Sequence, residues 1–273
     1  MFAAATEQVF AYTYVTVDEF GVIQARQRGH ARQAVIHLAT GVFLAMVYIP
    51  GGTFVMGSSV GQGYDDERPR HPVTIAPFAM SKTLITQAQW QSIMSTLPPC
   101  RFVGSTHPLE NVNWHEALSF CTALSARMGQ PVTLPSEAQW EYACRAQTET
   151  PFHTGETITS DLANYKGEFT FYHEPTGKNY GKTTPVGQFP ANGFGLTDMH
   201  GNLWEWCADV WHDNYRHAPD DGTVWSKGRM SAHRVGRGGS WHDIPATCRS
   251  ATRLKLKVSE GDETIGFRVV TAL

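Results

Sequence analysis

The sequence predicts an α+β domain with short strands, two or three short helices and much irregular loop. Helix starts are marked by capping boxes, in which the N-cap side chain and the side chain three residues later satisfy each other's backbone donors. Between positions 8 and 48, short runs alternate apolar and polar residues, which is typical of strands. From Pro151 onward Gly, Asn, Pro and aromatic residues dominate without helical period, which indicates irregular backbone pinned by turns.

The first 48 residues are expected to form strands and a hairpin. The runs VFAYTYVTV and AVIHLATGVFLAMVYIP alternate, and the turn sequence DEFG follows the first of them. We therefore predict a β-rich N-terminal extension over residues 1–46, at the edge of the main sheet. The principal domain is expected over residues 47–273.

Three helices are predicted beyond this extension. Their capping boxes pair Thr86 with Gln89, Asn113 with Glu116, and Ser136 with Gln139. The second helix carries apolar side chains at helical spacing on one face and ends at Gly129. Cys121 and Cys144 fall within the second and third helices, where we expect them to be core residues.

The composition and the net charge of the chain argue against some classes of binding partner. Of the 273 residues, 41% are hydrophobic and 17% charged, and the formal net charge is −3. Nucleic acids and membrane surfaces are therefore not expected partners, because no excess of cations is available to neutralise them. No apolar run reaches the roughly 18 residues of a membrane span, and no signal-peptide pattern opens the sequence. These features predict a cytoplasmic protein, or one delivered by a route that leaves no signal.

The cysteine pattern argues against a disulfide framework and against a thiolate zinc site. The chain has five cysteines, an odd number, and none of them forms a Cys-x-x-Cys pair. The acidic run Asp65, Asp66 and Glu67 could offer a binding rim, but charge runs are typical of solvated loops.

Several motifs in fixed order resemble one known family. They include IPGGTFVMGS, NVNWHEALSFC, LPSEAQWEYACRA, GFGLTDMHGNLWEW, RVGRGGSW and IGFRVV. Together they resemble the sulfatase-modifying-factor family, the formylglycine-generating-enzyme-like domain, from about Val47 to Val270. The resemblance implies a C-type-lectin-like fold with a small twisted antiparallel sheet. Because members of this family differ widely in what they do, function has to be argued from the site.

One branch of the family consists of copper-dependent oxidases, which hold the ion with two cysteines just past a Gly-Gly-Ser motif. Copper(I) is a soft ion that selects sulfur. Here the segment reads GGSWHDIPATC, so Asp243 stands at the first cysteine position and Cys248 alone remains. Copper is therefore not expected, and Cys248 is a weak catalytic candidate that is also interpreted as structural. Iron is not expected either, because the iron-dependent branch of the family takes its metal histidines from a helical bundle, of which the first forty residues show no trace.

The stretch DMHGNLWEW resembles the calcium loop of the family. The resemblance implies carboxylate ligands from Asp198 and Glu205 and carbonyl ligands from Gly201 and Leu203. The alternative is that Asp198 caps a turn while the neighbouring tryptophans fill the core.

The C-terminal segment, about residues 241–264, resembles the display region of another branch, the variable proteins of diversity-generating retroelements. Gly238, Gly239 and Trp241 would form a rigid frame, and exposed side chains beyond them would bind the ligand. The predicted ligand-binding residues are Trp241, His242, Asp243, Ile244, Thr247, Thr252, Leu254, Leu256, Lys257, Val258, Glu260, Glu263 and Thr264. The alternative is that LKLKV is an ordinary strand burying Leu254, Leu256 and Val258.

The sequence thus predicts a non-catalytic protein that binds a macromolecular ligand, a protein, through its C-terminal segment. A calcium ion would be structural, and retroelement diversification of the segment is part of the hypothesis. The alternative function is a metal-dependent oxidoreductase that acts on a thiol substrate with Cys248.

Overall fold

The computed structural model describes residues 5–228 and 230–273. Its strands are β1 (Ala5–Val17), β2 (Ile23–Ala39), β3 (Val42–Ile49), β4 (Gly52–Met56), β5 (His71–Ile75), β6 (Phe78–Ser81), β7 (Trp204–Trp211), β8 (Met230–Arg237), β9 (Arg253–Lys257), β10 (Ile265–Gly266) and β11 (Val270–Ala272). Its helices are α1 (Gln87–Met94), α2 (Trp114–Met128) and α3 (Glu137–Arg145), with short 3-10 turns η1 (Asp65–Glu67) and η2 (Pro245–Thr247).

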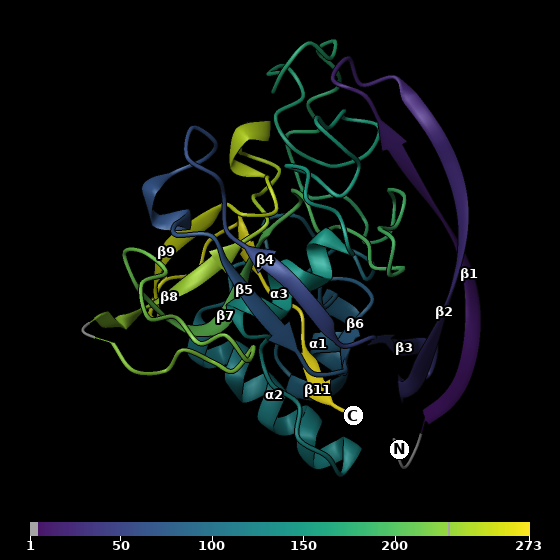
Figure 1. Cartoon of the computed structure of the whole chain (residues 1–273). Helices are drawn as coiled ribbons and strands as arrows, with labels where there is room; N and C mark the ends of the chain where they lie inside the picture. Colours follow the sequence, from purple (N-terminus) through teal and green to yellow (C-terminus); the bar gives the residue numbers. More distant parts are fainter. Residues whose placement is uncertain (1–4, 229) are drawn as a thin grey trace.

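The strands of the described residues pair into three sheets. The first has the order β1-β2-β3-β6-β11, the second β10-β7-β8-β9, and β4 pairs with β5 alone. All pairs are antiparallel except β10 with β7. Between α3 and β7 the chain runs through irregular loops, which cluster above the sheets in Figure 1. The α+β prediction, with few helices and much loop, is confirmed.

All three predicted helix starts are confirmed as capping boxes. At α1, the hydroxyl of Thr86 accepts from the amide of Gln89 at 3.2 Å, and the Gln89 side chain accepts from the Thr86 amide at 2.9 Å. The same reciprocal bonds open α2 and α3. α2 ends at Gly129, whose φ of 69° is the left-handed conformation that glycine adopts without strain.

The main core lies where α1 and α2 pack against the sheets. Trp90 of α1 stacks on Phe120 of α2 with ring centroids 5.4 Å apart, and Phe267 meets both rings edge-on. Cys121 and Cys144 are buried, as their helical positions predicted.

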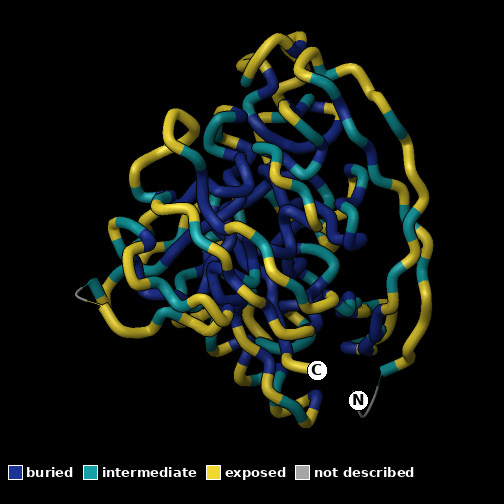
Figure 2. The backbone as a smooth tube through the Cα atoms, viewed as in Figure 1, coloured by how far each residue is buried: buried dark blue, intermediate teal, exposed yellow. Residues whose placement is uncertain are grey.

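The N-terminal extension is a long ribbon of β1 and β2, which we call the arm. It consists of residues 5–32, curves along one side of the molecule and is mostly exposed, whereas the body is buried at its centre (Figures 1 and 2). The predicted strands, hairpin and edge position are confirmed, since β1 is the edge strand of the five-stranded sheet. β2 continues into that sheet by pairing with β3 from Gln33 onward. The proposed boundary between residues 46 and 47 stays a prediction.

The loop-rich body is held by buried ion pairs. Arg253 meets Glu137 at 2.6 Å, and Arg268 meets Glu205 at 2.6 Å, with every one of these side chains at most 3% exposed. Glu67 is also fully buried, because its carboxylate forms a two-bond pair with Arg249. The interpretation of this acidic run as a solvated loop is therefore wrong for Glu67.

No helix in the described ranges combines the length and the apolar character that a membrane crossing requires.

Candidate functional site

The thiol of Cys248 lies in the core and not at a surface. Its exposed fraction is 0%, and it belongs to a cluster that includes Phe152 and Tyr165. Gly239 approaches so closely that a Cβ at that position would lie 2.4 Å from the Cys248 sulfur. Burial raises the pKa of the Cys248 thiol well above its usual value. Because the thiolate is the reactive species, this cysteine is held in its inert form.

Asp243, which replaces the first cysteine of the oxidases, fastens the loop in place. Its Oδ2 accepts hydrogen bonds from the Ser240 amide at 3.0 Å, from the Trp204 indole at 2.8 Å and from the Ser240 hydroxyl. A carboxylate with three donors is committed to the fold. Oδ2 is thus used by the fold, while Asp243 is half-buried, and its contact with a ligand stays a prediction.

Two of the predicted calcium ligands differ in what surrounds them. Glu205 accepts from Arg268 on both oxygens, at 2.6 and 2.7 Å, and from the Trp140 indole at 2.8 Å. Asp198 accepts from Gly187 through Oδ2, whereas its Oδ1 is buried with no hydrogen-bond partner in the described chain. Burial raises the pKa of the Asp198 carboxyl.

The remaining predicted calcium ligands are backbone carbonyls. Gly201 lies against the backbone of Asn164, and Leu203 is fully buried in an apolar cluster with Leu84. Since Glu205 is occupied by Arg268, the four predicted residues do not together fit a calcium site. Across residues 5–228 and 230–273, no three His, Cys, Asp or Glu side chains are grouped to hold a metal ion.

Two residues that were predicted to bind the ligand, Trp241 and Thr252, are buried. Trp241 is 6% exposed, packs edge-on against Phe102 and donates to the Glu263 carbonyl at 2.9 Å. Thr252 is 2% exposed. Trp241 is thus the anchor that the sequence predicted. Because Trp241 and Thr252 are buried, neither is available to a macromolecular ligand, and their prediction as ligand-binding residues was wrong.

The stretch after Arg253 is an ordinary strand. In β9, Leu254 and Leu256 are half-buried against the main core, which is the alternative that the alternating pattern left open. The following Val258 is also half-buried, and its amide donates to the Ala232 carbonyl.

The charged and polar members of the predicted set that follow Leu256 form ion pairs or hydrogen bonds with neighbouring side chains. Exposed Lys257 pairs with Glu260 at 2.8 Å. Glu263 pairs with Arg101, and the Thr264 hydroxyl donates to Asp262.

The exposed members of the predicted set that form no ion pair with a described residue lie in the loop around η2. His242 and Ile244 are exposed, with Ile244 at 39%, and Thr247 is half-exposed. Next to them, Ala246 and Arg249 form one wall of a cavity of about 330 Å³. This volume is within the range of small-ligand pockets, about 300–1,000 Å³.

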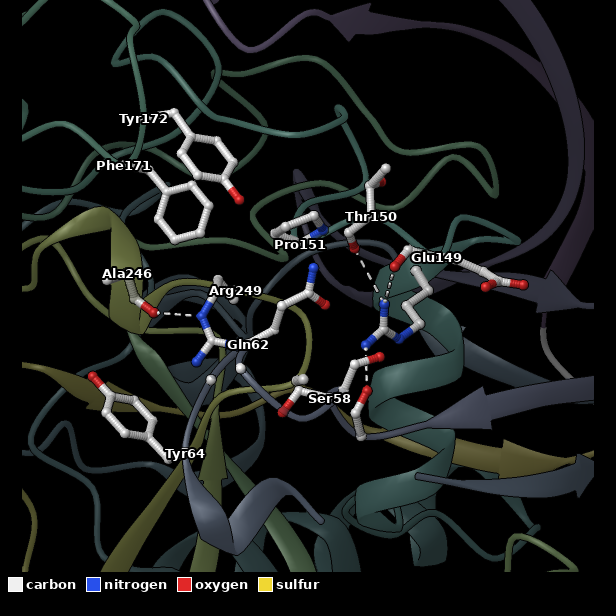
Figure 3. Close-up of a pocket in the computed structure, with 16 residues that line it drawn as sticks. Ser58, Gln62, Tyr64, Glu149, Thr150, Pro151, Phe171, Tyr172, Ala246 and Arg249 are labelled. Atoms are coloured by element: carbon white, nitrogen blue, oxygen red, sulfur yellow. Dashed lines mark hydrogen bonds between the residues drawn. The ribbon is translucent and has the colours of Figure 1, made fainter. Parts of the chain in front are cut away.

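The cavity brings together four distant parts of the chain (Figure 3). A glycine-rich loop at residues 57–64 lies beneath it, residues 149–151 lie on one side, and Phe171 and Tyr172 lie on another. Gln62 reaches from the loop into the middle of the space. Polar and aromatic groups therefore converge there, as they do in binding pockets.

Two buried arginines support the walls. Arg249 forms its pair with Glu67 and also donates to the Ala246 carbonyl at 2.9 Å. Arg145 pairs with Glu141 at 2.8 Å and donates to the Thr150 carbonyl at 3.2 Å. These bonds fix the backbone of the walls, which preorganises the cavity.

One polar group in the cavity lacks a partner. Ser58 is 8% exposed, and its hydroxyl has no hydrogen-bond partner among the residues that the structure describes. An unpaired buried hydroxyl is costly, so it favours a ligand that can hydrogen-bond with it.

Sequence reasoning missed most of this cavity. Three glycines at positions 57, 61 and 63 all have positive φ, and their clustering was a signal of an unusual loop. No local signal could pair that loop with Phe171 and Tyr172, because they are brought together only by the tertiary fold.

The fold and these motifs define a class: a loop-rich domain on a small antiparallel sheet. The chain belongs to the family described by the sulfatase-modifying factor enzyme 1-like domain, whose model matches residues 37–273. The resemblance seen in the motifs is thereby confirmed.

Relatives in this family are named for different functions. The formylglycine-generating enzyme of Mycobacterium tuberculosis is 27% identical over 292 residues, covering 82% of this chain and 97% of that protein. The serine/threonine-protein kinase pkn1 of Chlamydia caviae is 28% identical over 254 residues, covering 83% of this chain but 38% of that protein. The chain thus spans well under half the length of the kinase relative.

Solved structures confirm the fold. PvdO from Pseudomonas aeruginosa has a TM-score of 0.77 and 31% identity, covering 88% of this chain and 98% of that one. Variable protein 1 of Treponema denticola has a TM-score of 0.74 and 24% identity, covering 88% and 99%. The second similarity concerns the fold alone.

Proposed function

We propose that this protein binds a protein ligand at the cavity and over the adjoining exposed loop, residues 242–247, without a catalytic step. The observation that carries the proposal is the construction of one cavity wall. That wall comes from the segment in which the oxidases of the family hold copper, and here the segment supplies a hydrogen-bonded carboxylate and a buried thiol. The same segment presents His242, Ile244 and Thr247 to the outside.

The shape and chemistry of the cavity support a polypeptide ligand. A volume of about 330 Å³ accommodates one or two side chains of a partner, and Tyr64, Phe171 and Tyr172 supply aromatic contact area at its mouth. Tyrosines of this kind are enriched where proteins recognise one another. The hydroxyl of Ser58 and the amide of Gln62 add polar groups that orient the ligand.

Diversification by a retroelement is part of the same proposal. The positions that would vary are then the exposed ones of the loop, since the other members of the predicted set are buried, half-buried in β9 or paired with neighbours. A reverse-transcriptase gene next to a near-copy of the C-terminal coding segment would support this part. A genomic neighbourhood with neither would overturn it.

A peptide library displayed on phage tests the proposal directly. Peptides are selected on the full chain, and their dissociation constants are then measured by fluorescence polarisation for Ala246→Trp, which fills the cavity. We expect a loss of about tenfold or more, the size of a blocked hot spot. Lys227→Gln, an exposed position away from the cavity lining, should leave the affinities unchanged.

Two results would contradict the proposal. One is a set of selected peptides that bind Ala246→Trp as well as wild type, provided the variant keeps its thermal midpoint. The other is oxygen consumption by the copper- or iron-loaded chain with a thiol peptide, abolished in Cys248→Ser, which would establish the oxidoreductase alternative.

Structural calcium held without Glu205 remains a proposal, and it rests on the unpartnered Oδ1 of Asp198. Thermal denaturation in calcium and in a chelator tests it. A midpoint that is higher in calcium, and that loses this difference in Asp198→Asn, would support calcium binding, whereas equal midpoints would overturn it.

A further inference from the structure

The outer face of the arm carries a row of basic side chains that the proposed function does not use. Arg26, Arg28, His30 and Arg32 occupy alternate positions of β2, and all four are exposed. Alternate residues of a strand point to the same face, so the four side chains form one row, about 6.8 Å from one to the next. We call these four residues the basic row.

The strand register shows which residues share the face with the basic row. Opposite Arg28, His30 and Arg32 on β1 stand Thr13, Ala11 and Val9, and Val9 is 64% exposed. Directly opposed residues of an antiparallel pair lie on the same side of the sheet. The basic row is therefore flanked by uncharged side chains, including buried Val15 opposite Arg26, and one carboxylate, that of Glu7, lies at its Arg32 end.

The opposite face of the arm is turned to the body. The Tyr12 hydroxyl donates to the Gly193 carbonyl at 2.6 Å, and Lys82 lies 4.1 Å from the centre of the Phe10 ring. At the far end the body also covers Val15, which stands opposite Arg26 on the face of the basic row and is buried like Val17, and the Val17 amide donates to the Thr154 carbonyl at 2.7 Å. The arm is thus held at both ends and in the middle, which preorganises its outer face.

The charges of the basic row are largely unbalanced. Arg32 pairs with Glu7 at 2.8 Å, but Arg26 and Arg28 form no ion pair with any described residue. The chain as a whole has a net charge of −3, so this row is a local positive patch on a negative protein. Charged residues on exposed strands also prevent aggregation, and charges of mixed sign would serve that purpose equally well. All four residues of the basic row are instead of the basic type.

We propose that the basic row binds an acidic polypeptide segment in extended conformation. Alternate side chains of an extended strand recur at the same spacing of about 6.8 Å, so carboxylates at every second position of the partner match the four members of the basic row one to one. Arginine is suited to this role because its planar guanidinium bonds carboxylates bidentately.

Nucleic acid fits the surface less well. Single strands are bound by aromatic stacking along a basic groove. The aromatic residues of the arm, Phe10, Tyr12 and Tyr14, alternate with Val9, Ala11 and Thr13 and so lie on the face opposite the basic row.

Two synthetic peptides of identical composition test the spacing. One places glutamate at every second position among valine and threonine, and the other places the same glutamates in adjacent pairs. Binding to the full chain is measured by fluorescence polarisation at low ionic strength. We expect the alternating peptide to bind more tightly, and Arg26→Gln/Arg28→Gln to weaken it about tenfold, as expected for two lost charge contacts.

A matched control variant removes two positive charges from the body instead of from the arm. Arg216→Gln/Lys227→Gln neutralises two exposed cations of the body and should leave the binding of the alternating peptide within twofold of wild type. Because both double variants change exposed residues, their thermal midpoints should equal that of wild type.

Four results would overturn the proposal. They are the absence of binding to the alternating peptide, equal binding of both peptides, an equal effect of the two double variants, and tighter binding of a single-stranded 20-mer DNA than of the peptide. Sedimentation that shows self-association of wild type but not of Arg26→Gln/Arg28→Gln would instead assign the basic row to a second copy of the chain.

Discussion

The arginines of the body and those of the arm serve opposite purposes. In the body, Arg249 and Arg253 are buried and paired with carboxylates, and they join segments that are far apart in the sequence. On the arm, Arg26 and Arg28 are exposed and without an ion-pair partner among the described residues. The comparison shows that burial and pairing, and not residue type, separate an arginine that supports the fold from one that is available to a partner.

The largest loss of stability is expected for a buried arginine of the body. Arg249→Met leaves Glu67 buried without its partner, which should cost about 3–5 kcal/mol of unfolding free energy. Urea denaturation followed by tryptophan fluorescence measures it. Adding Glu67→Met should recover much of the loss, because the unpaired charge is removed. A loss below about 1 kcal/mol in the single variant would show that the pair does not hold the cavity wall.

The second prediction compares two glycines with nearly equal backbone angles. Gly239 of the body has φ +76°, and a Cβ there would lie 2.4 Å from the Cys248 sulfur, whereas Gly41 has φ +75° and nothing within 4 Å. Gly41→Ala should cost about 1 kcal/mol of backbone strain, and Gly239→Ala roughly 2–4 kcal/mol because overpacking adds to the strain. Equal losses in urea denaturation would mean that Cys248 packs loosely.

The third prediction concerns a histidine of the body. Burial lowers the pKa of His200 well below its usual value, and both ring nitrogens are used, one toward the Cys248 carbonyl and one toward the His153 amide. The fold therefore holds His200 neutral, while the unfolded chain protonates it below about pH 6.5. Stability should fall as pH drops below about 6.5, by about 1.4 kcal/mol per pH unit for this one group.

His200→Gln tests this dependence. The variant should lose less stability than wild type between about pH 6 and pH 4.5, while the difference between the two proteins stays constant above about pH 7.5. His153, stacked on His200 and with its pKa lowered to about 4 by burial, contributes in the same direction. Parallel pH profiles for the two proteins would contradict the neutral state of His200.

The smallest effect is expected on the arm. Arg28→Met is the same substitution as in the body, but at an exposed position it should change the unfolding free energy by no more than about 0.5 kcal/mol. Urea denaturation measures both variants under one condition. A loss comparable to that of Arg249→Met would mean that the arm arginines support the fold.

The sequence predicted local structure well where the signal lay within a few residues. The capping boxes at Thr86, Asn113 and Ser136 depend on side chains three positions apart, and each was found where it was expected. The hairpin of the arm follows from alternation and a turn at Asp18, whose carboxylate accepts from the Phe20 and Val22 amides.

The site was predicted less completely because its determinants are long-range. Burial of Thr252 and of Glu67 could not be deduced from sequence alone, since each depends on a partner segment that only the fold supplies. The engagement of Glu205 by Arg268, 63 positions away, likewise removed a ligand that the motif implied. In contrast, Trp241 was correctly predicted as an anchor because large aromatic side chains beside paired glycines are typically buried.

The loop between Asp243 and Arg249 is fastened at both ends, by Ser240 and Trp204 on one side and by Glu67 on the other. Within it, Ile244, Ala246 and Thr247 retain access to solvent, whereas Pro245 and Cys248 do not. A combinatorial library confined to those three codons would leave the scaffold intact while reshaping the rim of the cavity. The protein therefore offers a compact starting point for engineered recognition reagents.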